Sequence, residues 1–517
     1  MTSRVATTTK PSRLEQIERL GNALPDPVFI FLWLALALVG VSVIAAAYDV
    51  QAVHPLTGET LQAKSLLSSE NVRKLIVEMP KTFVAFPPLG LVLVVMLGAA
   101  VAERSGFFAA SIGRLVRRAP QAALVPTTFF IALLSHQAAD AAYVVLIPLA
   151  AMIFHQAGRH PLVGVAVAYA GISGAFAANI IPGQFDALIL GITHSAALMI
   201  DPSHVLNPLG NWWFTAALGG LLLLTALPVT KFIVEPRAQR WQVDGSAIET
   251  LSENPSDSPT ESRALRRAMV AAVLVILLFT LLTFTPGYSP LRDTNATGPA
   301  RLLPLYQGLI AGFMLLFLAT GWTYGKAVGS IKSHRDVVRM MGLGLRDLTP
   351  YLVLVFFAAH FIALFSWSNL GPILAINGAE FLKTLEVSAV VMLIPLLLVA
   401  MLFDFLIGSS SAKWSVMAPI VVPMLMLLGI TPEMTTAAYR MGDSIVNIIT
   451  PIASNFVLVL VMCQRWTRSF GIGSLIALML PFSIAFGVVG LLLVSLWAGF
   501  EIPPGPGVTG NFTVEIP

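Results

Sequence analysis

The sequence predicts an all-α integral membrane protein, with about nine transmembrane helices and two re-entrant hairpins arranged as an inverted repeat. Three observations lead to this fold class. Hydrophobic residues make up 56% of the 517 residues and charged residues 11%, whereas soluble domains are roughly 25% charged. Apolar stretches of the roughly 20 residues that cross a bilayer recur along the chain. One short motif also occurs twice.

The repeated motif joins a small polar segment to an aromatic residue and a proline. Residues 141–148 read AAYVVLIP and residues 412–419 read AKWSVMAP, so the two prolines are 271 positions apart. Tyr169 and Tyr439 follow, and each leads into an apolar helix that a proline interrupts. A doubled element with polar breaks is typical of secondary transporters whose substrate site lies at the repeat interface.

Nine apolar stretches are long enough to cross a membrane, and two of them are interrupted. Two further stretches, 121–158 and 384–428, are divided by the polar part of the motif into arms too short to cross. Non-helical backbone at membrane depth is tolerated only where protein buries it, which predicts a re-entrant hairpin in each half. The predicted crossings are 27–48, 82–103, 161–200 (interrupted), 211–234, 268–286, 302–322, 347–368, 434–462 (interrupted) and 473–499.

Basic residues divide the connecting segments into two sets. Lys and Arg concentrate in the N-terminal tail (1–26) and after the second, fourth, sixth and eighth crossings. By the positive-inside rule, we expect the N-terminus in the cytoplasm and the C-terminal tail (501–517) on the outer side of the membrane. The hairpins then enter from opposite faces, so the halves are inverted. The loops poorer in basic residues are 49–80, 201–210, 287–301 and 369–383.

A polar segment separates the two halves. The first half spans 27–235, the linker 236–267 and the second half 268–500. The linker is rich in Ser, Glu, Asp and Pro, and we expect it to be a cytoplasmic loop. A single cysteine, Cys463, excludes an internal disulfide. The basic residues sit in loops and form no soluble basic domain, so the sequence predicts no nucleic-acid partner.

Ionisable residues within the apolar stretches are the first candidates for function, because they are costly inside a membrane. Asp186 follows the break in the third crossing, where it can cap the second half-helix, serve the site, or do both. Asn179 precedes that break, and its amide with the Asp186 carboxylate would suit Na⁺ or a proton. Arg440 and Asp443 lie three residues apart in the eighth crossing, as a structural ion pair or as a substrate clamp beside a coupling site.

The hairpin tips supply a second group of candidates. Trp414 offers a face for stacking an aromatic substrate or is a packing residue, and Ser411 can donate to an anion or simply cap a helix. His136 titrates with transport or is a satisfied structural histidine. Asp404 is interpreted as a helix cap. The tip residues are Ser135, His136 and Asp140 in the first hairpin, and Ser409, Ser410 and Lys413 in the second.

These motifs resemble those of the AbgT family, the p-aminobenzoyl-glutamate transporters. The resemblance runs from about residue 15 to 507. It implies a homodimeric inner-membrane transporter with nine transmembrane helices and two opposed hairpins that move against a dimerising scaffold. The motifs that carry it are 158–161 (GRHP), 178–179 (AN), 186–188 (DAL), 407–414 (IGSSSAKW), 418–429 (APIVVPMLMLLG) and 439–451 (YRMGDSIVNIITP).

The resemblance also implies which residues function. They stand at family positions and are Asp186, Ser411, Trp414, Arg440, Asp443 and Pro451. One departure affects the site: family members typically have Gly-Thr-Thr-Asp where residues 183–186 read GQFD. The family's activities are uptake of p-aminobenzoyl-glutamate and export of sulfonamide-like antimetabolites, driven by Na⁺ in some members and by protons in others.

We therefore expect a secondary transporter of p-aminobenzoate-type aromatic carboxylates. In this hypothesis Trp414 packs the aromatic ring, while Arg440 and Ser411, with Asn179 and Pro451 nearby, bind the substrate. Asp186 or Asp443 carries the coupling ion, a proton or Na⁺, and no other cofactor or metal is expected. A small dicarboxylate carrier of the same superfamily is the alternative. A channel fits opposed hairpins less well, and a metal enzyme lacks paired histidine motifs.

Overall fold

The computed structural model describes residues 27–54, 58–118, 120–138, 140–244, 258–296, 301–384, 386, 388–405, 407–451 and 453–512. The predicted N-terminal tail lies outside the described residues, as does the central part of the linker. The described residues are mostly helical, which confirms the all-α part of the predicted fold class. Strands among the described residues form one antiparallel pair, β1 (Gln51–Val53) and β2 (Thr60–Gln62).

Seven helices of the described chain are long and apolar enough to cross a membrane. They coincide with the seven uninterrupted crossings that the sequence predicts. The chain is therefore a multi-pass membrane protein. These helices are α2 (Pro27–Ala47), α5 (Pro87–Arg104), α11 (Trp212–Val229), α14 (Pro259–Phe284), α15 (Leu303–Val328), α17 (Thr349–Trp367) and α23 (Ile472–Gly499).

Both interrupted segments are broken where the sequence places proline. In the first, α9 (Pro161–Tyr169) continues as a π-helix, η3 (Ala170–Gly174), before non-helical residues lead to α10 (Gln184–Ala197). In the second, α21 (Pro432–Val446) ends before a break that leads to α22 (Ser454–Trp466). Since proline lacks the N–H that a helix interior needs, Pro182 and Pro451 favour these breaks.

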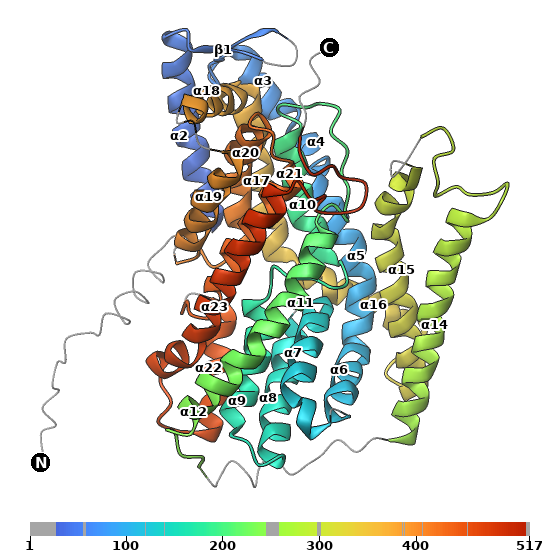
Figure 1. The fold of residues 1–517 in the computed structure, drawn as a ribbon. Coiled ribbons are helices and arrows are strands. Elements are labelled where there is room, and N and C mark those ends of the chain that lie inside the picture. The colour runs from blue at the N-terminus through green and yellow to red at the C-terminus, as the bar shows by residue number, and fades with distance from the viewer. Residues whose placement is uncertain are drawn as a thin grey trace, which may run out of the picture.

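Two pairs of shorter helices carry the repeated motif at their turns. The first pair is α7 (Leu124–Leu134) and α8 (Asp140–Gln156), joined by the 3₁₀ turn η2 (Ser135–Ala138). The second is α19 (Ala389–Asp404) and α20 (Ser410–Met426). In Figure 1, α7 and α8 lie in the lower part of the molecule, and α19 and α20 lie above them.

The sequence missed several shorter helices. Segments treated as loops contain α3 (Ser69–Val77), α4 (Met79–Val84), α6 (Phe107–Arg117) and α18 (Leu370–Thr384). Their apolar runs are too short to predict a crossing, so hydropathy alone gave no signal. The remaining elements are η1 (Gln121–Ala123), η4 (Thr230–Val234), α12 (Glu235–Ala238) and α16 (His334–Asp347).

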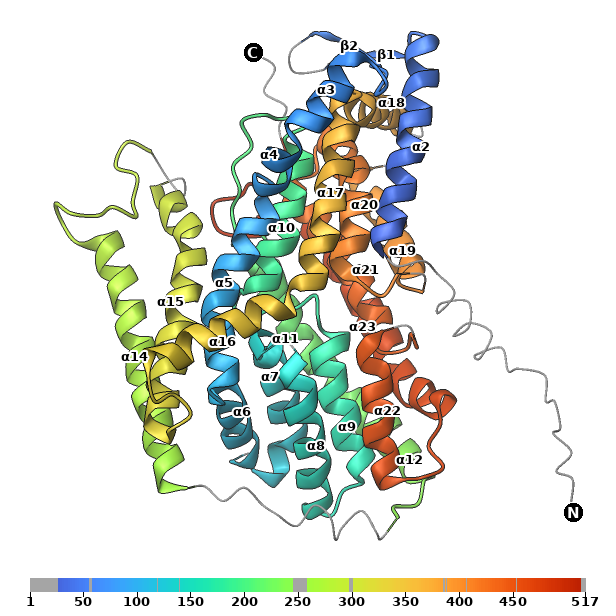
Figure 2. The same ribbon diagram turned by 180° about the vertical axis from the view of Figure 1, so that it is seen from behind.

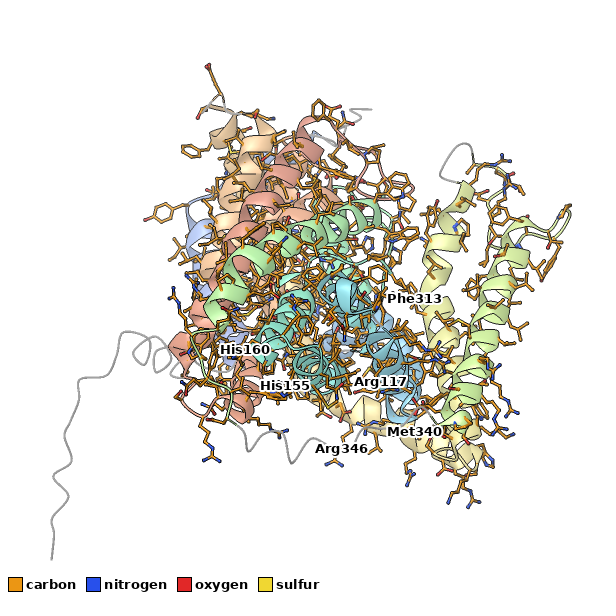
Figure 3. All side chains as sticks on the ribbon, turned by 60° about the horizontal axis from the view of Figure 1, so that its bottom comes forward. Arg117, His155, His160, Phe313, Met340 and Arg346 are labelled. Atoms are coloured by element: carbon orange, nitrogen blue, oxygen red, sulfur yellow. The ribbon has the colours of Figure 1, made fainter. Side chains whose placement is uncertain are left out.

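Figure 2 shows α16 lying across α5, and α14 with α15 standing to one side of the main bundle. Figure 3 brings the lower end of Figure 1 forward and shows Arg117, His155, His160 and Arg346 there. This end also carries the loops after α5 and α15, so it is the basic end that the sequence assigns to the cytoplasm.

Close packing of α5 on α15 depends on small residues. A Cβ on Gly98 would lie 2.2 Å from the backbone oxygen of Met314, and one on Gly321 would lie 2.5 Å from backbone atoms of Ala102. Such contacts let transmembrane backbones approach closely, so van der Waals contact replaces the hydrophobic effect that lipid removes.

We predict that Gly98→Ala lowers thermal stability in detergent, because the methyl group meets backbone that cannot move aside. Overpacking of this kind costs about 1–3 kcal/mol. Gly90→Ala is the matched control, since it lies in the same helix and its Cβ would meet nothing within 4 Å. Equal melting temperatures for the two variants would contradict the packing argument.

Candidate functional site

The two interrupted helices meet through a buried ion pair. Nη1 of Arg440 in α21 donates to Oδ1 of Asp186 in α10 at 2.6 Å. The side chains are only 1% and 6% exposed. A second link runs from the Tyr169 hydroxyl to the backbone oxygen of Asn447 at 3.1 Å. The break of each half is thus tied to the other half.

Asp186 is both a helix cap and a member of this pair, so the two interpretations left open by the sequence hold together. Its Oδ2 accepts from the backbone N–H of Gly183 and from Nδ2 of Asn179, each at 2.8 Å. A Cβ on Gly183 would lie 2.2 Å from Oε1 of Gln137, so a larger residue there would need the end of the Gln137 side chain to move. The carboxylate is therefore held by three N–H donors.

His136 extends this arrangement to the first tip. Its Nδ1 lies 2.8 Å from Oδ1 of Asn179, and its Nε2 faces the backbone oxygens of Gly171 at 3.2 Å and Ile172 at 3.0 Å. The ring also meets the Phe176 ring edge-on at 5.8 Å. A continuous chain thus joins His136, Asn179, Asp186 and Arg440.

A second buried cluster surrounds Lys413. Its Nζ contacts Asp404 and lies 2.5 Å from Oδ1 of Asp443, and the Lys413 side chain is fully buried. The sequence interpretation of Asp404 is corrected here. Asp404 is an ion-pair partner rather than a cap, because Ser409 accepts from the N–H of Ala412 and caps α20. Lys413, predicted as a tip residue, lies in the first turn of α20 with its side chain buried.

Arg440 and Asp443 also do not pair with each other. Although they lie three residues apart, Arg440 binds Asp186 and Asp443 binds Lys413. Sequence spacing identifies neighbours on one helix but not the stronger partners on other elements. The Asp443 carboxylate also accepts a hydrogen bond from the Ser410 hydroxyl, with 2.8 Å between Oγ and Oδ2.

Tyr439 connects the second tip with α21. Its hydroxyl lies 2.6 Å from the backbone oxygen of Ser410, to which it donates, and 3.3 Å from Oδ1 of Asp443. Ser409 and Ser411 are half-buried and lie 3.4 Å apart through their hydroxyls. In this conformation Ser411 therefore contacts its own tip rather than the Arg440 guanidinium.

Trp414 is fully buried against Tyr439, with ring centroids 4.3 Å apart and planes 21° from parallel. Its Nε1 donates to Oγ1 of Thr193 at 2.9 Å, which links the second tip to α10. The repeat-equivalent pair, Tyr143 and Tyr169, is edge-on at 6.4 Å. In both halves the aromatic residue of the motif thus contacts the following tyrosine, edge-on in the first half and stacked in the second.

Arg440 retains an unused hydrogen-bonding edge. Nε and Nη2 are buried and have no hydrogen-bond partner among the described residues. The guanidinium lies over the Phe185 ring at 5.3 Å, and Phe185 packs on Phe176 at 4.3 Å. A buried donor pair of this geometry matches a carboxylate, which guanidinium binds through two parallel hydrogen bonds.

The buried charges do not balance within the described residues of the two clusters. Three carboxylates face two cations, so full ionisation leaves one net negative charge. An uncompensated buried charge is costly, so a cation or proton in the cluster is favoured. The five groups are Asp186, Asp404, Asp443, Arg440 and Lys413.

The remaining predicted residues occupy varied places. Ser135 donates to the backbone oxygen of Ala132 at 2.7 Å and satisfies the end of α7. Pro451 is half-buried in the second break. The Asp140 side chain lies outside the described residues. Sequence reasoning missed Thr193 and Thr436, whose hydroxyls lie 2.7 Å apart beneath Trp414; single threonines in apolar helices carry no pattern.

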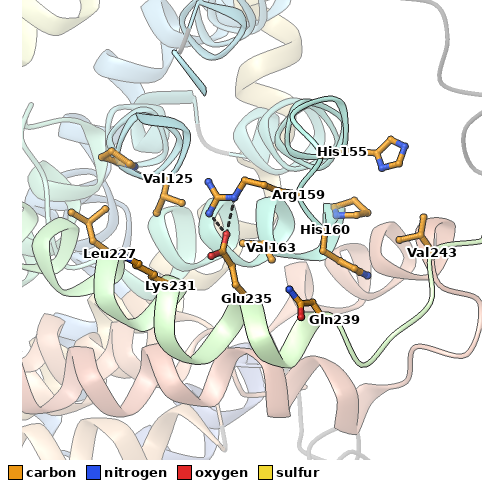
Figure 4. A pocket seen from close by; sticks show the side chains of 13 residues that line it. Val125, His155, Arg159, His160, Val163, Leu227, Lys231, Glu235, Gln239 and Val243 are labelled. Carbon is orange, nitrogen blue, oxygen red and sulfur yellow. Dashed lines mark hydrogen bonds and ion pairs between the residues drawn. The ribbon is translucent and has the colours of Figure 1, made fainter. Parts of the chain in front are cut away.

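A separate cavity of about 850 Å³ opens at the basic end. Figure 4 shows Arg159 and Glu235 paired within it, with His155, His160 and Lys231 around them. His160 is satisfied there, since Nε2 donates to the Trp241 oxygen and Nδ1 accepts from the Leu162 N–H. None of the residues predicted for the site lines this cavity.

The fold and the buried charge clusters define a multi-pass helical membrane transporter. The chain belongs to the AbgT family, because the model described as "AbgT putative transporter family" matches residues 13–512. It is 32% identical over 495 residues to the p-aminobenzoyl-glutamate transport protein of Escherichia coli (strain K12), covering 95% of this chain and 96% of that one. Family members are transport proteins, so this chain is a transporter rather than an enzyme.

Solved structures agree. The YdaH transporter of Alcanivorax borkumensis matches with a TM-score of 0.87 at 40% identity, covering 93% of this chain and 100% of that one. MtrF of Neisseria gonorrhoeae, which illuminates a class of antimetabolite efflux pumps, matches with a TM-score of 0.88 at 37% identity, covering 94% and 97%.

We predict that Lys413→Met strongly destabilises the protein, because it leaves Asp404 and Asp443 buried without their cation. Breaking a buried pair in this way costs about 3–5 kcal/mol. Adding Asp404→Asn should restore part of the lost melting temperature. Lys383→Met, an exposed lysine in α18, is the control. No rescue by the second substitution would contradict the ion-pair assignment.

Proposed function

We propose that the protein is a secondary active transporter of p-aminobenzoate-type aromatic carboxylates, coupled to a proton or Na⁺ gradient. Its substrates would be p-aminobenzoyl-glutamate, sulfonamide-like antimetabolites, or both. Support comes from one relative that transports p-aminobenzoyl-glutamate and one that belongs to a class of antimetabolite efflux pumps.

The observation that carries the proposal is the unused edge of Arg440. Its two free donors are buried beside an aromatic ring, Phe185. A benzoate-type ligand would place its carboxylate on the guanidinium and its ring against neighbouring aromatic residues, where stacking is favourable. Arg440 is already neutralised by Asp186 on one nitrogen, which lowers the cost of its burial in the empty site.

Access to this site requires movement. Arg440 is 1% exposed and Trp414 is 0% exposed, so neither can touch a substrate in this conformation. The serines at the second tip are half-buried, whereas Trp414, three residues after Ser411, is fully buried. We propose that displacement of the helix pairs opens the site, with Trp414 leaving Tyr439 to pack the substrate ring and Ser411 turning toward its acidic end.

The arrangement around Asp186 is unfavourable for Na⁺. Both carboxylate oxygens accept from N–H donors, and one donor is the Arg440 cation. A Na⁺ ion at Asn179 and Asp186 would have to replace these donors, because it needs several oxygen ligands of its own. Asp443 likewise already holds the Lys413 cation.

The proposed assembly is a homodimer in the bacterial inner membrane, with nine crossings and two re-entrant helix pairs. The two interrupted segments complete the nine when added to the seven long helices. The basic end in Figure 3 would face the cytoplasm, which places the N-terminus inside and the C-terminus in the periplasm. Opposed helix pairs would then form the inverted repeat.

Transport by purified protein in liposomes tests the proposal. Counterflow of radiolabelled p-aminobenzoyl-glutamate and of a sulfonamide would be measured, with succinate as a competitor, under an imposed Na⁺ gradient and then a pH gradient. Flux of either aromatic compound that resists succinate supports the proposal. Aromatic flux that succinate suppresses would favour a dicarboxylate carrier, since the Arg440 edge could also bind a dicarboxylate.

We predict that Arg440→Lys weakens binding of p-aminobenzoyl-glutamate by about 10- to 100-fold, because a charged hydrogen bond contributes about 1.5–3 kcal/mol. Lysine keeps the charge for Asp186 but loses the planar fork. Affinity would be measured by concentration-dependent inhibition of counterflow. Arg335→Lys, at an exposed position in α16, should leave it unchanged. Unaltered affinity in Arg440→Lys would exclude Arg440 as the carboxylate ligand.

A further inference from the structure

The hydrogen-bond chain from His136 to Arg440 does not close without an extra proton. Nε2 of His136 faces two backbone oxygens, so it must carry a hydrogen. Nδ1 faces the amide of Asn179 at 2.8 Å, and the other end of that amide faces Oδ2 of Asp186 at 2.8 Å. The hydrogens must be placed so that each of these contacts joins one donor to one acceptor.

Both orientations of the Asn179 amide require one extra proton in this chain. With Oδ1 toward His136, Nδ1 must donate, and the imidazole is a cation. With the amide reversed, Nδ2 donates to His136 and Oδ1 faces Asp186, whose Oδ2 must then be protonated. A neutral imidazole beside an ionised carboxylate leaves two acceptors in contact in either orientation.

We infer that His136, Asn179 and Asp186 form a site for one proton, which resides on Nδ1 of His136 or on Oδ2 of Asp186 according to the orientation of the Asn179 amide. Moving between the two forms breaks one N–H bond and forms one O–H bond. The assignment rests on the proposed transport function only in that release of this proton would drive the cycle.

The charge balance supports the inference independently. The buried clusters carry one net negative charge when their five ionisable groups are charged. One bound proton neutralises them. Losing it would restore the buried charge and break one link between the first tip and α10, so that protonation and the position of η2 are coupled.

Among the side chains that the structure describes, which exclude Asp140 of the adjoining α8, other charged groups do not replace this proton. Asp186 faces His136 from α10, with Arg440 of α21 behind it. Helix α7 and η3 contain no Asp, Glu, Lys or Arg. On the neighbouring α5 and α6, Glu103 lies in the last turn of α5, and the arginines bind elsewhere: Arg104 to Asp347, Arg114 to Ser262 and Arg117 to Glu261.

The test separates coupling from transport. In proteoliposomes, counterflow of p-aminobenzoyl-glutamate needs no net proton movement, whereas accumulation under a pH gradient does. With one proton per substrate, a gradient of about one pH unit supports about tenfold accumulation. We expect His136→Gln to retain counterflow but lose accumulation, while the exposed His334→Gln retains both.

Several outcomes would overturn the inference. Full accumulation by His136→Gln, or loss of counterflow together with accumulation, would leave His136 without a coupling role. Accumulation that follows Na⁺ and ignores pH in the unmodified protein would assign the missing charge to Na⁺. Absence of counterflow in the unmodified protein would instead refute the proposed substrate.

Infrared difference spectra of the unmodified protein, recorded without substrate at acid and alkaline pH, test the site even if a variant fails to fold. We expect an imidazolium signal that His136→Gln removes or a protonated carboxyl signal that Asp186→Asn removes. Finding neither signal at the pH of transport would refute the proton site.

Discussion

The ion pair between Arg440 and Asp186 neutralises two charges that are buried in the membrane core, and it holds both side chains in place. It joins α21 to α10, the two helices whose interruptions define the repeats. Each residue performs a second task, since Asp186 caps α10 through Gly183 and Arg440 leaves two donors unused. Without its partner, each helix would bury an unpaired charge in the membrane, which is costly.

The repeated motif acquires a physical meaning from the structure. Its aromatic residue packs on the tyrosine of the following interrupted helix in both halves, as Tyr143 on Tyr169 and as Trp414 on Tyr439. The halves differ in what surrounds these pairs. The second turn adds Lys413 and the serines, while the first adds His136. Our two proposals thus place the carboxylate ligand, Arg440, in one half and the proton site in the other.

Much of the fold could be predicted from sequence because apolar length is a direct physical requirement of the bilayer. The seven long helices were predicted on that ground, and both interruptions from the prolines within apolar stretches. Short helices such as α6 and α18 were missed, because their apolar runs are too short to predict a membrane crossing. The candidate residues were identified as costly charges, but their partners were not.

Asp404 illustrates the limit. From sequence it is an acid at a helix end, and a cap is the ordinary explanation. Its contact with Lys413 depends on how α19 and α20 fold together, which no local pattern encodes. The unused edge of Arg440 could not be predicted from sequence either, because it depends on the lack of hydrogen-bond acceptors beside Nε and Nη2 among the described residues. Such relations are tertiary, whereas sequence periodicity reports only neighbours on one element.

The most direct measurement combines a change in the protein with a matching change in the ligand. Binding of p-aminobenzoate and of its neutral amide would be compared in the unmodified protein and in Arg440→Gln. If Arg440 binds the carboxylate, the amide weakens binding to the unmodified protein but not to the variant, with a coupling of about 1.5–3 kcal/mol. Additive effects, with the same loss in both proteins, would contradict the account.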